Sequence, residues 1–314
     1  MRDIVEFIPA HLENLRVLIN AHLDLLFSGW ALTAEFIASR LSSCPEQPIM
    51  DPWVAERRTL CAFDRGRLVA AAHLLRYADD AVVSHDFRNA GDIAWFLAQP
   101  GEEDAGRELL TAARQAMRQW GVRVVYAWGT GLPVRVCSGI PNTWPHIRRL
   151  LISSGFESTA DDEYIFGGSL DGVAAPDPDP VPGVQIRCSV TNWEALFSLW
   201  HENENIGHCE CCADLTHNGR LPAFKGCGEL RELVVATQWR NRGLGRWLVQ
   251  HAVTWLRGAG CDRVIFSVIP SDDAHGAGRF YRRFGWDKLV TFEKGWLALE
   301  RWNVGTLKRW NVLL

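Results

Sequence analysis

The sequence predicts an α/β protein of two domains, and three observations support this. The chain has 314 residues, about twice the length of a typical domain. Residues 171–183 contain four prolines and two glycines, which sustain neither a helix nor a central strand and so predict a linker. The order helix, apolar run, helix and Gly-aromatic pair occurs once in each half. Because apolar runs alternate with helices, we expect helices layered on a sheet in two domains, 1–170 and 184–314.

The first half has a hairpin as its plainest feature. Asp64, Arg65 and Gly66 separate two apolar runs, and a short segment ending in glycine between such runs favours a tight turn. β-branched and aromatic residues mark a later strand, which follows a long amphipathic helix. We expect strands at 4–8, 59–63, 67–76, 92–97 and 122–128, and helices at 11–26, 33–41, 103–119 and 145–154.

The second half repeats the pattern with one gap. Thr191 is suited to cap a helix at 192–204, since its hydroxyl can accept a bond from a free N–H of the first turn. The hairpin of the first half has no evident counterpart between Ile206 and Gly228, and the sequence offers no reason for this. We expect strands at 184–188, 229–236 and 263–268, and helices at 192–204, 244–256 and 274–284.

Composition excludes several classes of protein. The formal net charge is −4, which gives no support to a nucleic-acid binder that neutralises phosphates. No apolar run approaches the roughly 18 residues of a membrane-spanning helix, and the first residues do not resemble a signal peptide. We therefore expect a cytoplasmic protein with reduced cysteines and with neither nucleic acid nor membrane as a partner. The sequence leaves the oligomeric state open.

The segment from Leu233 to Val249 carries the strongest chemical pattern. A buried strand is expected to run into a loop with two close glycines, and this loop opens an amphipathic helix. Free N–H groups and the helix dipole attract anions to a helix N-terminus, and glycine lets the backbone approach them. The spacing fits neither a P-loop nor the Rossmann fingerprint. We predict a phosphate or pyrophosphate site formed by Gln238, Arg240, Asn241, Arg242, Gly243, Leu244, Gly245 and Arg246.

The spacing Arg-x-x-Gly-x-Gly, from Arg240 to Gly245, resembles the acyl-CoA pyrophosphate loop of the GNAT acyltransferase superfamily. A second string, from Ala277 to Trp286, resembles a later helix of that family, with Tyr281 four residues before the Gly-aromatic pair. The alternative for the first motif is a glycine-started helix with solvated arginines. The resemblance implies two tandem units, each a mixed, mostly antiparallel sheet flanked by helices. It also implies acetyl-CoA, or another short acyl-CoA, as co-substrate.

The resemblance covers about residues 229–292 and implies roles for particular side chains. Tyr281 would protonate the leaving thiolate, a step that a phenol can perform. The alternative for this residue is packing against Phe280 and Phe284. The strand residues that would offer backbone groups to the pantetheine arm are Leu233, Val234 and Val235. The sequence departs from the family pattern at Ala274, where asparagine is frequent, and at Thr237, where proline is common.

Two carboxylates are candidates for the base that takes a proton from the attacking amine. Glu229 and Glu232 precede the loop, and Glu229 falls where several family members place such a group. Strand alternation puts the two side chains on opposite faces, so that at most one would line the cleft. Solvated strand-end carboxylates, with a water chain as the base, are an equally good interpretation.

The first half resembles a second unit whose loop has decayed. The corresponding segment, 99–107, has widely spaced glycines, and its three consecutive acidic residues would repel a pyrophosphate. Leu150 and Leu151 stand about where the other half has its tyrosine. We expect this domain to shape the substrate cleft or an interface without catalysing.

A cysteine- and histidine-rich stretch, 208–227, is compatible with a zinc site. It lacks a repeated Cys-x-x-Cys pair, so buried thiols and loop histidines are the favoured interpretation for its candidate ligands, which include His208 and His217, and no metal ligand is assigned. The alternative is that His201, His208 and His217 line the acceptor pocket. The sequence as a whole predicts an N-acetyltransferase that moves an acetyl group directly to a primary amine of a small molecule or peptide. The alternative is an acyl-CoA-binding or interaction protein with little or no turnover.

Overall fold

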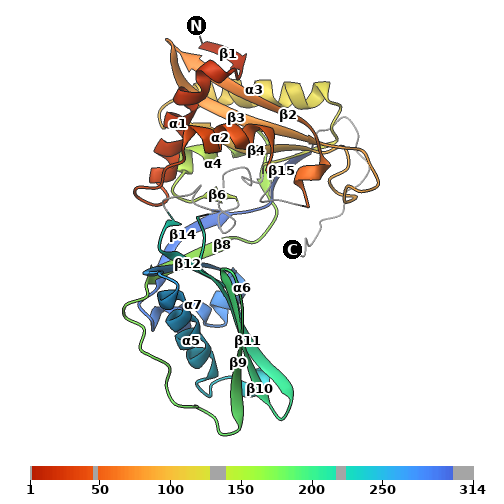
Figure 1. Ribbon diagram of the computed structural model, residues 1–314. Helices are drawn as coiled ribbons and strands as arrows, with labels where there is room; N and C mark the ends of the chain where they lie inside the picture. Colours follow the sequence, from red (N-terminus) through yellow and green to blue (C-terminus); the bar gives the residue numbers. More distant parts are fainter. Residues whose placement is uncertain (1, 45–48, 128–138, 217–223, 300–314) are drawn as a thin grey trace. The chain divides into compact units, whose positions relative to one another are not determined.

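The computed structural model describes residues 2–44, 49–127, 139–216 and 224–299 (Figure 1). The chain forms two compact units: unit 1 comprises Met1–Glu163 and Val290–Leu314, and unit 2 comprises Tyr164–Leu289. The division thus falls before residues 171–183, and the end of the chain returns to unit 1. These bounds differ from the expected domains, 1–170 and 184–314. None of the helices that the structure describes combines the length and apolar character that a membrane span requires.

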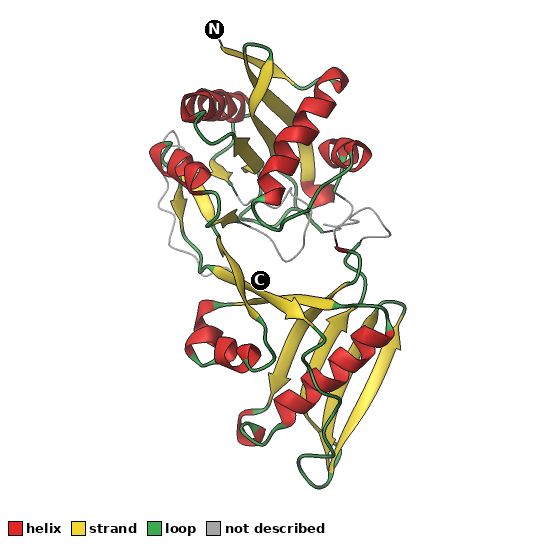
Figure 2. Cartoon of the chain, turned by 90° about the vertical axis from the view of Figure 1, so that its left-hand side faces the viewer, coloured by secondary structure: helices red, strands yellow, loops and turns green. Residues whose placement is uncertain are grey.

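Unit 1 is a mixed sheet with helices on both faces (Figure 2). Helices α1 (Leu12–Asp24) and α2 (Ala34–Ser42) and the long helix α3 (Glu103–Gln119) pack on its central strands. Strand β4 (Gly91–Ala98) is buried along its whole length because both of its faces are covered. The sheet order is β1 (Arg2–Glu6), β2 (Val54–Asp64), β3 (Arg67–Tyr77), β4, β5 (Val124–Tyr126), β15 (Trp296–Leu299) and β7 (Glu157–Ser158).

The hairpin predicted in the first half is confirmed. Strands β2 and β3 pair in antiparallel fashion, with Asp64 opposite Arg67. Arg65 and Gly66 have φ values of 48° and 79°, which is the left-handed conformation of a two-residue turn that matches strand twist. Helix α3 also begins and ends at the expected residues.

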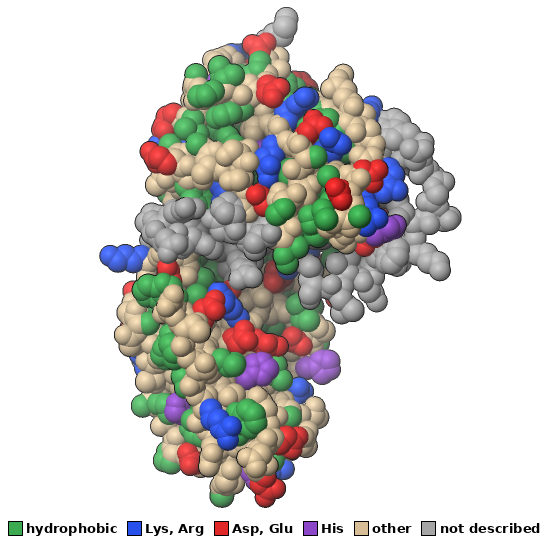
Figure 3. Space-filling model, turned by 45° about the vertical axis from the view of Figure 1, so that its right-hand side comes forward, with side chains coloured by type: hydrophobic (Ala, Val, Ile, Leu, Met, Phe, Trp, Pro, Cys, Tyr) green, Lys and Arg blue, Asp and Glu red, His purple; other side chains and the backbone are tan. Residues whose placement is uncertain are grey.

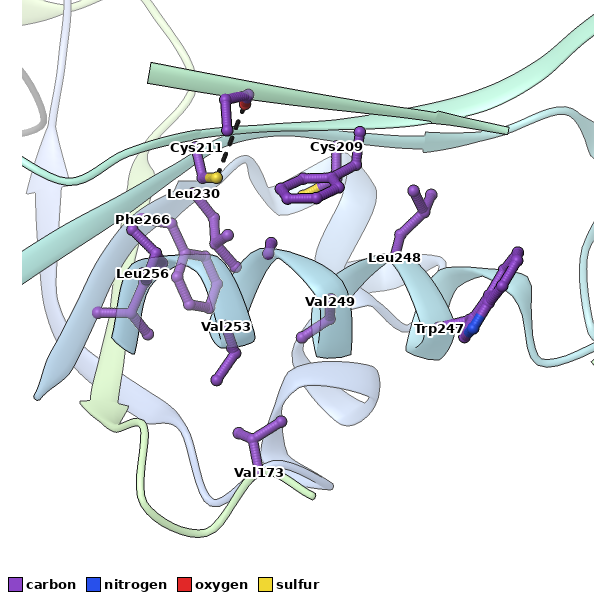
Figure 4. Close-up of a cluster of buried hydrophobic side chains, with 14 of the residues drawn as sticks. Val173, Cys209, Cys211, Leu230, Trp247, Leu248, Val249, Val253, Leu256 and Phe266 are labelled. Carbon is purple, nitrogen blue, oxygen red and sulfur yellow. Dashed lines mark hydrogen bonds between the residues drawn. The ribbon is translucent and has the colours of Figure 1, made fainter. Parts of the chain in front are cut away.

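The strands of unit 2 form a second mixed sheet, and helix α5 (Leu244–Gly258) packs on one face of it. The apolar side of α5 lies under the buried side chains of the strands, as Figure 4 shows for Cys209 and Leu230. The short helices α6 (Pro270–Ala274) and α7 (Ala277–Arg282) precede the last strand. The strand order is β14 (Asp287–Glu293), β8 (Glu163–Ser169), β13 (Arg263–Val268), β12 (Cys227–Val235), β11 (Glu204–Cys212), β10 (Glu194–His201) and β9 (Val184–Thr191). The residues of unit 1 also contain the short strand β6 (Ile140–Pro141).

The helix expected at 192–204 is wrong. This segment is β10, which pairs with β9 on one side and with β11 on the other. Ala195, Phe197 and Leu199 alternate with less buried residues, the period of a strand. Glu202 and Asn203 both have positive φ and form the two-residue turn to β11. The hairpin that seemed to be missing from the second half is therefore β10–β11, whose first strand and turn precede Ile206.

The expected helix 274–284 is interrupted. Gly276 has φ of 100° and separates α6 from α7. The carboxylate of Asp273 accepts a hydrogen bond from the N–H of Gly278 at 3.0 Å, so that the break is stabilised by a side chain. Strand β13 has the predicted bounds, and β12 and α5 differ from their predicted bounds by two residues at most.

Each sheet contains a strand that the linear order of the chain would assign elsewhere. Strand β15, near the end of the chain, pairs with β5 and β7 in the sheet of unit 1. Strand β8 precedes residues 171–183, yet it lies between β14 and β13, and its Phe166 is fully buried. The sheet of unit 1 is therefore completed by β15, and the sheet of unit 2 by β8.

Fragment stability should therefore depend on β8. We expect residues 164–293 to give a soluble fragment that unfolds cooperatively, because all the described strands from β8 to β14 are kept. A fragment of residues 184–314 lacks β8, leaves β13 without its antiparallel partner and should aggregate. Circular dichroism and thermal melting of both fragments test this. Equal stability of the two would contradict the role given to β8.

Candidate functional site

The central strands of unit 2 separate at the point where the candidate site lies. Strands β12 and β13 are parallel and pair from Cys227 opposite Arg263 to Glu229 opposite Ile265. Beyond this point β12 continues to Val235 beside β11, without a described pairing to β13. The backbone of β12 from residue 230 to residue 235, which includes Leu233, Val234 and Val235, thus has one edge without a described strand partner.

The predicted loop at the end of β12 has the backbone of an anion site. Asn241 and Gly243 have φ of 62° and 85°, and Gly243 caps the N-terminus of α5. Within the described chain, the N–H groups of residues 241–246 have no hydrogen-bond partner. A Cβ at Gly245 would lie 3.6 Å from the ring of Phe280, an ordinary van der Waals contact, so the start of α5 packs beside this ring. Six free donors at a helix N-terminus fit a pyrophosphate.

The three arginines of the loop differ in their surroundings. Arg240 donates from Nε to the carbonyl oxygen of Val235 at 2.9 Å, and Arg242 lies over the ring of Trp239, 5.0 Å from its centre. Neither has a carboxylate partner among the described residues. Arg246, in contrast, lies 3.4 Å from Asp177. The free positive charge of the loop therefore comes from the first two arginines.

The expected linker, 171–183, packs along α5. Asp177 accepts a hydrogen bond from the indole of Trp247 through its carbonyl oxygen and another from Gln250 through its carboxylate, both at 3.1 Å. A Cβ at Gly243 would come within 3.3 Å of Pro180, so this segment reaches the loop. The segment is consequently part of unit 2.

Tyr281 lies on α7 among aromatic side chains. Its ring centre is 4.3 Å from that of Phe266 and 5.1 Å from that of Phe280, so the packing interpretation is correct as far as the ring is concerned. Burial raises the pKa of its phenol, and the nearby Cys209 and Asp272 act in the same direction. The hydroxyl is thus kept protonated at neutral pH, the form in which it can donate a proton.

The two candidate bases share a face of the sheet, so the expectation of opposite faces is wrong. In the register of β11 and β12, Glu232 is opposite Glu210 and Glu229 is opposite Cys212. Residues 210 and 212 lie two apart and point the same way. The extra residue on β12 is Arg231, a β-bulge that breaks the simple alternation.

The surroundings of the two carboxylates differ sharply. Glu229 is 5% exposed and accepts a hydrogen bond from Arg231 at 3.0 Å. Burial alone would lower the pKa of Arg231, but its hydrogen bonds to Glu194 and Glu229 raise it, so this ion-paired group stays charged. Glu232 is half-exposed, and its carboxylate lies 3.1 Å from Nε2 of His208 on the neighbouring strand. The sequence favours His208 as a loop histidine, whereas the structure places it on strand β11.

The cysteines of the same stretch are buried thiols. Burial raises the pKa of both Cys209 and Cys227 to about 12, so neither is a ready thiolate. The described residues contain no group of three or more side chains placed to hold a metal ion. His217, the other candidate ligand, lies outside the described residues.

The corresponding position in unit 1 is filled by side chains. His22 of α1 lies 2.9 Å from the carbonyl oxygen of Ala98, where β4 ends, and 3.4 Å from His146 of α4 (Pro145–Ser153). Leu150 comes so close to Gly106 that a Cβ there would lie 2.6 Å from it. Helices from both faces thus meet at the end of β4, and little room remains for a ligand.

The acidic residues of the first helical turn in unit 1 are also engaged. Glu102 pairs with Arg67 at 2.6 Å, and Glu103 lies 3.6 Å from Arg149. Carboxylates stabilise a helix N-terminus in the way an anion would. This agrees with the structural interpretation of 99–107.

Comparisons with known proteins agree with this geometry. Residues 168–286 match the model of the acetyltransferase (GNAT) family. Among solved structures, a tandem GNAT protein from the clavulanic acid biosynthesis pathway is similar over 95% of this chain and 98% of its own, with a TM-score of 0.61 and 14% identity. A GCN5-related N-acetyltransferase from Sphaerobacter thermophilus is similar over 94% of both chains, with a TM-score of 0.59 and 15% identity.

A third match is the GCN5-related glucosamine N-acetyltransferase region of a fungal multi-domain β-N-acetylglucosaminidase. It covers 95% of this chain and 38% of that one, with a TM-score of 0.59 and 16% identity. No protein of curated function matches the sequence. The comparisons establish the tandem GNAT fold and place the family's sequence pattern in the C-terminal half.

The buried histidines of unit 1 should make its stability depend on pH. Burial, and then the neighbouring His22, lowers the pKa of His146 to about 4. In the unfolded chain this imidazole binds a proton near pH 6.5, so stability is present above that pH and is lost as the pH falls towards 4. We expect His146→Gln to reduce the acid loss by about 1–2 kcal/mol.

Thermal melts from pH 7.5 to 4.5 measure this effect. His85→Gln serves as the control, because His85 is exposed and should leave the pH dependence unchanged. Identical pH dependence of the wild type and His146→Gln would contradict the prediction.

Proposed function

We propose that this protein, a member of the GNAT superfamily built from two GNAT-type units, transfers an acetyl or other short acyl group from acyl-CoA to an amine. Unit 2 carries the activity and unit 1 supports it. The observation that carries the proposal is the set of free N–H groups at residues 241–246, at the end of a strand that has separated from its parallel neighbour.

The residues present fit the parts of an acyl-CoA. The loop amides, with Arg240 and Arg242, suit the pyrophosphate, because hydrogen bonds to an oxyanion are stronger than hydrogen bonds between neutral groups. The free edge of β12 can bond to the amides of the pantetheine arm, and the thioester carbonyl would accept from the same edge. Acyl-CoA supplies an activated acyl group with a thiolate leaving group.

Tyr281 is the proposed proton donor to the departing thiolate. Its hydroxyl is protonated at neutral pH for the reason given above, and its ring is fixed by Phe266 and Phe280. Fixed orientation matters because positioning a catalytic group removes an entropic cost from the reaction. The reaction is direct: the amine attacks the thioester carbonyl, the C–N bond forms and the C–S bond breaks.

The activity is tested by CoA release from acetyl-CoA in the presence of amines. A suitable panel is glucosamine, ethanolamine, spermidine and a lysine-containing peptide, with thiol formation followed by a colorimetric reagent. Release that depends on an amine supports the proposal. Saturable binding of acetyl-CoA without release from any of these amines would favour a binding protein instead.

Binding of acyl-CoA should occur once per chain and depend on the loop of unit 2. Arg242→Glu places a negative charge beside the free amides, and we expect the Kd for acetyl-CoA to rise about tenfold or more, which is about 1.4 kcal/mol. Arg107→Glu is the matched control, since Arg107 stands in the first turns of the corresponding helix of unit 1. Isothermal titration calorimetry gives both numbers. Two equivalent sites, or equal weakening by both variants, would refute the assignment.

Replacing Tyr281 should slow the reaction and leave binding intact. Tyr281→Phe keeps the packed ring and removes the proton donor, so kcat should fall by roughly 10²–10⁴-fold. The Kd for acetyl-CoA and the melting temperature should change little. An unchanged kcat would mean that water or another group protonates the thiolate.

A further inference from the structure

Unit 2 lacks a helical layer that unit 1 possesses. In unit 1, α1 and α2 lie between β1 and β2 in the chain and cover the face opposite α3. In unit 2, β9 turns directly into β10, and no described helix of this unit covers the face opposite α5 (Figure 1). Leu196 and Val234 on this face are 37% and 38% exposed. We refer to the side of β9–β12 that bears Leu196, Ser198, His208, Glu210 and Glu232 as the open face.

The open face is polar and carries acidic and histidine side chains, which are grouped in Figure 3. On this face Nε2 of His208 lies 3.1 Å from Oε2 of Glu232. Nδ1 of His208 has no partner among the described residues. A neutral imidazole with one nitrogen beside a carboxylate has its other nitrogen available as a proton acceptor.

The pair lies level with Tyr281 along the strands but on the other face. Cys209, whose thiol influences the phenol of Tyr281, follows His208 on β11 and points to the α5 face. Its register partner on β12 is Leu233, which follows Glu232. Successive residues of a strand point to opposite faces, so the phenol and the imidazole flank the same segment of β11 and β12. This segment of β12 is the one that has separated from β13.

We propose that His208, oriented by Glu232, is the base that accepts the proton from the attacking amine; this rests on the proposed acyl transfer. The amine reaches the thioester from the open face. As its nitrogen bonds to the acyl carbon, its proton passes to Nδ1 of His208. The C–S bond breaks, and the thiolate takes the proton of Tyr281 from the opposite face. His208 then returns its proton to solvent, and Tyr281 regains one.

This assignment replaces Glu229 as the leading candidate. The carboxylate of Glu229 is buried in an ion pair with Arg231, and protonating it would break that pair. His208 is half-buried and reaches solvent at the open face. The neighbouring strands oppose it with the uncharged Ser198 and Val234.

Other charged groups on this face lie further along the neighbouring strands or two strands away. Glu210 is two residues from His208 and opposite Glu232. Arg187 of β9 is level with His208 but separated from it by Ser198 of β10, and it lies over the ring of Trp200, 4.3 Å from its centre. The ion pairs of Arg231 with Glu194 and Glu229 complete the set. Glu232 is therefore the charged group in contact with His208.

The test compares three variants of the full chain, using acetyl-CoA and the best amine of the panel. His208→Gln keeps a polar side chain that cannot accept a proton, and kcat/KM should fall by roughly 10²-fold or more with loss of the acidic limb of its pH profile. Glu232→Gln removes the carboxylate that orients the imidazole, so kcat/KM should also fall. Glu210→Gln, the control, should lower it less, because Glu210 has no described contact with His208.

Affinity for acetyl-CoA and melting temperature should be unchanged in all three variants, which separates a chemical role from a structural one. Wild-type turnover with a normal pH profile in His208→Gln would overturn the assignment of the base and leave acyl transfer standing. Absence of CoA release by the wild type would overturn acyl transfer and the assignment of the base together.

Discussion

The separation of β12 from β13 after Glu229 and Ile265 is the constraint on which the site depends. Two parallel strands in a continuous sheet would consume each other's backbone groups and leave no place for a ligand. Here the register runs for three residue pairs and then stops, while β11 continues to hold β12 as far as Val235. The roles proposed for the loop amides, Tyr281 and the His208–Glu232 pair all depend on this separation, because each group borders the same segment of β12.

The two units have similar architectures but differ in whether side chains fill the space at the end of the central strand. Near the start of α3, Leu150 leaves no room beside Gly106, whereas near the start of α5, Phe280 stands at van der Waals distance from a Cβ at Gly245. In unit 1 a helix on each face supplies a histidine to the end of β4. Unit 2 has no described counterpart of α1 and α2, so its open face gives access that unit 1 lacks. The unit that has the anion loop is thus also the unit without a described helical layer on one face of its sheet.

Local sequence was sufficient wherever local chemistry determines the structure. The bounds of α3 and β13 and the turn at Arg65-Gly66 were predicted because periodicity and positive φ are short-range properties. The residues 194–201 were mistaken for a helix because Leu, Ala and Glu favour one, and pairing with strands on both sides prevails over that preference. The bulge at Arg231 likewise has no short-range mark, so the shared face of Glu229 and Glu232 followed only from the register.

The sheets that β8 and β15 join could not be predicted either, because strand pairing is not a short-range property of the sequence. The position of β15 also has a consequence for folding. Strand β15 pairs with β5, about 170 residues earlier in the chain, so the sheet of unit 1 is completed by contacts of very high sequence separation. The entropic cost of closing such a loop must be met before the pairing contributes. β1 to β5 can form their ladders first, because their partners are much closer in the sequence, whereas β15 is synthesised only after unit 2. Because its strand β15 is encoded after unit 2, unit 1 cannot be removed as a simple N-terminal module, and this linkage gives a physical reason for keeping both units in one chain.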